Sequence, residues 1–267
     1  MCMTDGHCAT ASEVIFVQFS ATGCPGADGS AAMPYCAPND AVGVLKSTRH
    51  VIVVVGNTNG QMTLHSSGLS PVIIGRKNTA GTSGSIPANA AIAVTVQSDT
   101  VLIRDLTVNL GGGASSTGIL VQGSGTNVTL LRVTASLGMG VGVEADTGTM
   151  LTMDSCTVSN NSMGGGILLN GAAFDIENTI VTNNGPGTFG GLTTWAGVLI
   201  NMPPSSGPAK LHLLTVESNN QIGVSCSSDI SAMVSGVLAS LNAGGVQISP
   251  TCNFSSCGTA GPACGAQ

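Results

Sequence analysis

The sequence predicts an all-β solenoid, in which short strands stack coil upon coil. Three observations predict it: an apolar unit that recurs about every two dozen residues, strand-like alternation of apolar and polar residues, and an unusual composition. Of the 267 residues, 42% are hydrophobic and only 7% are charged, while glycine occurs 38 times. Low charge can accompany disorder, but disorder also requires low hydrophobicity, so this composition favours a strand-rich fold with a large core.

The recurring unit is a glycine followed by alternating apolar residues. It begins at Gly118, Gly142, Gly166, Gly197, Gly223 and Gly245, and the widest spacing contains an insertion around residues 188–194. A unit this short cannot bury a core alone, whereas stacked units bury a continuous one. Equivalent residues of successive coils are then expected about 4.8 Å apart, the spacing of neighbouring strands.

A second strand-like run lies between these units and ends near an asparagine. The clearest examples are residues 151–160 and 174–183, with shorter echoes at 102–109, 211–219 and 234–242. Alternation in each run places one face inward. The asparagines are expected at corners, where they tolerate a left-handed backbone and form ladders between coils.

The chain divides into three parts on this interpretation. Residues 1–50 form an N-terminal cap with a strand within residues 13–19 and a short helix over 39–46, residues 51–250 form the β-helix, and residues 251–267 form a Cys-rich C-terminal tail. Caps are required because an uncovered terminal coil would expose strand edges and core.

These repeats resemble those of right-handed parallel β-helix proteins of the pectin-lyase-like superfamily, from about Val51 to Ile248. The head is similar to that of secreted bacterial β-helix proteins, because Asp28-Gly-Ser30 and Pro34-Tyr-Cys36 precede the helix and first strand. The resemblance implies an extracellular protein and a polysaccharide as partner. The Asn-Thr-Asp, Asp-Asp, Gly-His-Gly and Arg-Ile-Lys signatures of polygalacturonases are absent from the sequence, so the resemblance supplies no catalytic residues.

Nine cysteines indicate an oxidising compartment, and their spacing matches no zinc motif. Eight lie near the ends and are expected to form disulfides there, in a connectivity that spacing leaves open: Cys2, Cys8, Cys24, Cys36, Cys226, Cys252, Cys257 and Cys264. Cys156 stands alone and is expected to be a free thiol in the core. A lipid anchor on Cys2 is an alternative for that residue.

Charge and hydropathy restrict the partners. The net charge is −6 and the basic residues are scattered singly, which argues against nucleic acid. No apolar run approaches the length of a transmembrane helix. The chain opens without a signal peptide, so we expect the export signal to have been removed already and the protein to be secreted or displayed on the cell surface.

Candidate chemistry comes from aligning the second runs. Asp105 and Arg132 fall in one column, which predicts either a substrate clamp or an ordinary ion pair. Asp154 and Glu177 fall in the next column, one coil apart. Two carboxylates at that distance predict either a catalytic or calcium-binding pair, in which one pKa rises, or two solvated side chains. No cofactor is expected unless calcium binds there.

Two further groups are candidates. Trp195 and Phe189 flank the insertion and predict either a small sugar-stacking platform or an anchor that holds the loop. Lys210 and His212 share one face of a strand, and the sequence places no carboxylate beside them. A threonine column at Thr107, Thr134, Thr157 and Thr215 raises ice binding as a weaker idea, because the column is irregular.

The sequence therefore favours a non-catalytic module for glycan binding, adhesion or structural support. The alternative is a divergent polysaccharide lyase or glycoside hydrolase that acts on an acidic polysaccharide. Convergence of Asp105, Arg132, Asp154, Glu177 and Trp195 on one groove would favour the enzyme, and scatter would count against it.

Overall fold

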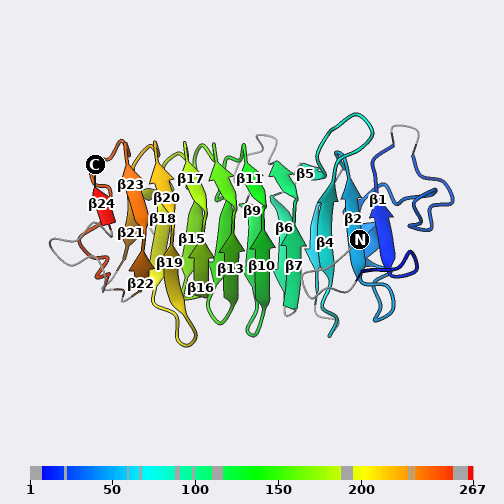
Figure 1. The fold of residues 1–267 in the computed structure, drawn as a ribbon, viewed down its shortest axis with the longest axis horizontal. Helices are drawn as coiled ribbons and strands as arrows, with labels where there is room; N and C mark the ends of the chain where they lie inside the picture. The colour runs from blue at the N-terminus through cyan, green and yellow to red at the C-terminus, as the bar shows by residue number, and fades with distance from the viewer. Residues whose placement is uncertain are drawn as a thin grey trace.

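The computed structural model is an elongated right-handed parallel β-solenoid, with its coils stacked along the long axis (Figure 1). It describes residues 8–20, 23–58, 60–65, 68–87, 91–97, 100–109, 117–187, 195–227, 230, 232–254 and 264–266. Within these residues the strands form three sheets, and every strand pairing is parallel. The predicted fold class is confirmed.

The nine-stranded sheet runs the full length of the solenoid. Its strands, in order, are β1 (Val14–Val17), β2 (Val51–Val55), β4 (Val72–Arg76), β7 (Thr100–Arg104), β10 (Asn127–Leu131), β13 (Met150–Asp154), β16 (Ala173–Glu177), β19 (Ala209–His212) and β22 (Met233–Ser235). Successive strands stack in register, so that Val128, Leu151 and Phe174 form one buried column. Each such side chain contributes about 1.5–3 kcal/mol through burial.

Two smaller sheets complete each coil. The eight-stranded sheet contains β5 (Ser85–Pro87), β8 (Thr107–Asn109), β11 (Thr134–Ser136), β14 (Thr157–Ser159), β17 (Ile180–Thr182), β20 (Thr215–Glu217), β23 (Val237–Ser240) and β24 (Cys264–Ala266). The seven-stranded sheet contains β3 (Met62–Leu64), β6 (Ile92–Gln97), β9 (Thr117–Gln122), β12 (Val143–Asp146), β15 (Ile167–Asn170), β18 (Trp195–Met202) and β21 (Ile222–Cys226).

The second strand-like run of each coil is split in two by a corner. After β7, β10, β13, β16 and β19 comes one residue with positive φ, and the chain turns there into the eight-stranded sheet: Asp105, Arg132, Ser155, Asn178 and Leu213. The residue after each of these corners points inward and is buried: Leu106, Val133, Cys156, Thr179 and Leu214. Cys156 therefore occupies a core position, and the prediction of a free buried thiol is confirmed.

A buried asparagine ladder lies at the next corner, after the strands of the eight-stranded sheet. The side-chain amide of Asn161 donates to Asn184 at 2.9 Å, Asn184 donates to Asn219 at 3.0 Å, and Asn219 donates to Asn242 at 2.9 Å. The preceding residues Asn160 and Asn183 take the left-handed conformation. Both predicted roles of asparagine are thus present: one residue takes the left-handed corner, and the next residue forms the ladder between coils.

The ends of the solenoid are covered. The helix α1 (Pro38–Val42) contacts β3 at the N-terminal end and is shorter than the 39–46 predicted, because residues 46–49 form a tight turn instead. Strand β1, predicted as part of the cap, pairs with β2 and extends the nine-stranded sheet. At the other end, β24 pairs with β23, and Phe254 pairs with Ala232.

Disulfides lie near both ends, as predicted. Cys24 is bonded to Cys36 and Cys226 to Cys252, and Cys8 is also disulfide-bonded. Cys2 and Cys257 lie outside the described residues, and only the backbone of Cys264 is described. In the described part of the chain, no helix has the length and apolar character needed to cross a membrane.

Candidate functional site

Two rows of outward-facing side chains cross the C-terminal half of the nine-stranded sheet. Alternation along β16, β19 and β22 points every second residue outward, and parallel register aligns these residues from strand to strand. Asp175, Lys210 and Met233 form one row, while Glu177, His212 and Ser235 form the other. Asp154 of β13 continues the second row, next to Glu177.

These rows border a hollow of about 470 Å³ in the surface of the sheet. Its lining residues come from three successive strands: Asp175, Glu177, Lys210, Leu211, His212, Met233, Val234 and Ser235. The exposed side of Met233 adds an apolar surface to an otherwise polar rim, since its side chain is 65% exposed. We call this depression the hollow below.

An ion pair and a carboxylate–imidazole contact join β16 to β19 inside the hollow. Lys210 Nζ lies 3.1 Å from Asp175 Oδ2, and His212 Nδ1 lies 3.8 Å from Glu177 Oε2. The side chains remain between 32% and 49% exposed. Exposed pairs of this kind contribute only about 0.2–1 kcal/mol, so they add little to the stability of the fold.

These pairs do not follow from the regular repeat because this coil is longer than its neighbours. Asp175 and Lys210 are 35 residues apart, whereas the ladder residues Asn219 and Asn242 of adjacent coils are 23 apart. A search for partners at about two dozen residues therefore passes over Lys210 and His212. The expectation that no carboxylate lies beside them is wrong, and alignment of residues 173–177 with 209–212 was the available signal.

Asp154 and Glu177 are register neighbours, as predicted, but Asp154 is stabilised as an anion. Asn178 Nδ2 donates to Asp154 Oδ1 at 3.0 Å, and Ser155 Oγ donates to the same oxygen at 2.8 Å. The hydrogen bond from Asn178, then that from Ser155, with a smaller contribution from Arg132, hold the pKa of Asp154 below its ordinary value. Repulsion between stacked carboxylates therefore does not raise the pKa of Asp154.

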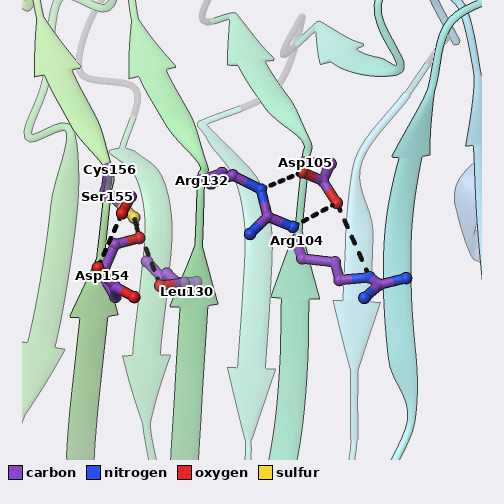
Figure 2. Close-up of polar contacts among 7 residues, drawn as sticks. All are labelled: Arg104, Asp105, Leu130, Arg132, Asp154, Ser155 and Cys156. Carbon is purple, nitrogen blue, oxygen red and sulfur yellow. Dashed lines mark hydrogen bonds and ion pairs between the residues drawn. The ribbon is translucent and has the colours of Figure 1, made fainter. Parts of the chain in front are cut away.

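Asp105 and Arg132 form a two-pronged ion pair away from the hollow (Figure 2). Arg132 donates from Nε to Asp105 Oδ1 at 2.6 Å and from Nη2 to Oδ2 at 3.0 Å. Arg104 Nε also approaches Asp105, at 3.8 Å. Both members of the pair stand at left-handed corners rather than in strands. This arrangement matches the ordinary ion pair.

Trp195 is fully buried on the outer side of the seven-stranded sheet, where it packs with Leu168 and Leu199 in a cluster separate from the main core. A Cβ added at Gly165 or Gly187 would lie 2.3 Å or 2.2 Å from its ring, so the indole fits only because both are glycines. A stacking platform needs an exposed ring, which Trp195 does not offer. The insertion at residues 188–194, with Phe189, lies outside the described residues.

The predicted residues therefore do not converge on one groove. Of the five, Glu177 lines the hollow and Asp154 adjoins it, while Asp105 and Arg132 pair with each other and Trp195 lies in another sheet. Within the described residues, no group of three or more histidine, cysteine, aspartate or glutamate side chains is arranged to hold a metal ion.

Two other features of the surface have clear positions. Thr107, Thr134 and Thr157 are in register, but Ile180 occupies the next position before Thr215, so the threonine column is interrupted. Glu144, which interrupts an apolar run, is only partly solvated, because Leu120 and Leu168 are its neighbours on the adjacent strands. Burial, and then repulsion by Asp146, raise the pKa of Glu144.

Comparisons with known proteins agree with this architecture. The crystal structure of pectate lyase Pel9A is similar in fold, with a TM-score of 0.55 over 92% of this chain and 74% of that chain, at 13% sequence identity. No curated protein sequence matches the chain. A family model described as a right-handed β-helix region matches residues 117–265, which is more than half of the chain. The chain therefore belongs to the right-handed β-helix family.

Proposed function

We propose that this protein is an extracellular, non-catalytic module that binds a glycan in the hollow of the nine-stranded sheet. The observation that carries the proposal is the in-register pairing of Asp175 with Lys210 and of Glu177 with His212 in a surface depression. Sugars present many hydroxyl groups, each of which is both a donor and an acceptor. Carboxylates accept from such groups and an ammonium donates to them, with charge-assisted hydrogen bonds.

The shape of the hollow suits an extended chain of sugars. Its lining comes from three consecutive strands, and neighbouring strands are about 4.8 Å apart, so successive sugar units would meet the outward side chains of successive rungs. Met233 supplies an apolar contact for the carbon face of a sugar ring, a role that suits the flexible methionine side chain. The rigid sheet holds these groups in place before a ligand arrives, which lowers the entropic cost of binding.

An extracellular location fits the disulfides described near both ends, Cys24–Cys36 and Cys226–Cys252. Structural disulfides form and persist in oxidising compartments. Glycans on cell surfaces and in extracellular matrices are the partners available there.

A glycan array followed by calorimetric titration tests the proposal. The wild-type protein should bind at least one glycan class, and Lys210→Ala and His212→Ala should each weaken binding by about tenfold or more, as expected when a charge-assisted hydrogen bond is lost. Glu217→Gln, on the eight-stranded sheet, is the matched control and should bind like the wild type. Absence of binding to every glycan, or unchanged affinity in both hollow variants, would refute the proposal.

A second candidate is cleavage of the glycan bound there. One observation favours it: Glu177 and His212 form a carboxylate–imidazole pair within the hollow, and such pairs serve as general acid–base groups. Incubation with glycans that bind should then release reducing or unsaturated ends, and His212→Ala should abolish the product while Asp105→Asn preserves it. Binding without any product after prolonged incubation would leave only the binding module.

A further inference from the structure

We propose that the hollow selects uncharged sugars and rejects uronic acids, because its ammonium group is already neutralised by a carboxylate of the protein and further carboxylates lie beside it. This inference rests on the proposed function, and it names the class of glycan that the same site takes. It concerns the charges that a ligand would meet on β13, β16 and β19.

The ammonium group of Lys210 is already paired in the hollow. Lys210 Nζ is 3.1 Å from Asp175, and His212 Nδ1 is 3.8 Å from Glu177. A uronate that accepted from a remaining Lys210 donor would lie beside the carboxylate of Asp175, and one that displaced Asp175 would exchange one carboxylate for another without net gain. Like charges at such distances repel one another.

The surroundings of the hollow add negative charge. Asp154 is the register neighbour of Glu177, and hydrogen bonds from Asn178 and Ser155 satisfy it as an anion without any cation from a ligand. The nearby Arg132 is engaged in its two-pronged pair with Asp105. The whole chain carries a net charge of −6, so its long-range field also repels polyanions.

Hydroxyl groups of an uncharged sugar avoid these penalties. They donate to the outer oxygens of Asp175 and Glu177 and accept from Lys210 without breaking either ion pair, because each carboxylate has about four acceptor positions and each ammonium has three donors. The pairing between side chains of the protein therefore fixes the orientation of the polar groups and also disfavours uronates. Unfavourable charges confer specificity in protein interfaces in the same way.

The test compares matched oligosaccharides that differ only in the C6 group, such as galactose and galacturonic acid oligomers of the same linkage and length. In calorimetric titrations at low salt, the wild type should bind the uncharged oligomer at least about fivefold more tightly than the uronate. Asp175→Asn frees Lys210 and should reduce this preference to less than twofold or reverse it. Glu217→Gln removes the same charge from the eight-stranded sheet and should leave the preference unchanged.

The outcomes separate this inference from the function on which it rests. Equal or tighter binding of the uronate by the wild type, or an unchanged preference in Asp175→Asn, would overturn the selectivity while leaving glycan binding intact. The same preference change in Glu217→Gln would assign the effect to overall charge and also overturn it. If neither oligomer nor any array glycan binds, the proposed function itself fails. Circular dichroism of each variant verifies that the solenoid is folded.

Discussion

Replacing Asn184 by alanine should destabilise the middle of the solenoid strongly. The side chain of Asn184 takes part in four hydrogen bonds: it accepts from the backbone and side-chain N–H groups of Asn161, and it donates to Val158 O and to Asn219 Oδ1. All these groups are buried, so alanine leaves several of them without partners. At about 1 kcal/mol for each lost bond, the free energy of unfolding should fall by about 4 kcal/mol.

Urea unfolding followed by far-UV circular dichroism measures this loss, and amide hydrogen exchange locates it. The backbone N–H of Asn161 loses its acceptor and should exchange faster, whereas the N–H of Asn219 still donates to Asn242 and should change less. Asn183→Gly is the matched control, because Asn183 is exposed and its positive φ suits glycine. A loss below about 1 kcal/mol in Asn184→Ala, or an equal loss in the control, would refute the reasoning.

Three other predictions follow from buried groups. Trp195→Ala should lower the free energy of unfolding by about 3–5 kcal/mol because the whole ring is buried against Gly165 and Gly187, and chemical denaturation will measure it. Glu144→Gln should raise the melting temperature at pH 7 but not at pH 3. The pKa of Glu144 is raised in the folded state, so its contribution to stability is fully present below its unfolded pKa and is lost as the pH rises through the folded pKa. An equal gain in melting temperature at both pH values would contradict this. Cys156 should resist alkylation at pH 8 until the protein is denatured, because burial raises the pKa of its thiol to about 11, and peptide mass spectrometry would reveal any labelling of the native protein.

Repetition made most of the fold predictable from the sequence. Apolar residues recur at the spacing of one coil, so the parallel stacking, the core columns and the core position of Cys156 all follow from the alignment of runs. The split of each second run into two strands did not follow. Left-handed corners fall on Asp105, Arg132 and Ser155, and these side chains carry no consistent signal for a positive φ.

The candidate site was less predictable because it depends on register across an irregular coil. Asp154 and Glu177 were placed correctly as neighbours at regular spacing. The partners of Lys210 and His212 lie 35 residues away, beyond the period that the rest of the chain suggests. The burial of Trp195 depends on glycines at positions 165 and 187 that only the folded chain brings beneath its ring.

The longer coil between β16 and β19 also bears on how such a protein can change over time. Both β16–β19 and β19–β22 keep an unbroken register although the first connection is longer, whereas β18 of the longer coil shows register shifts against β15 and β21. Insertions at corners therefore leave the nine-stranded sheet in register, and the seven-stranded sheet absorbs the irregularity. New recognition surfaces can be acquired one corner at a time, so related chains should differ in their ligands while their cylinders superimpose.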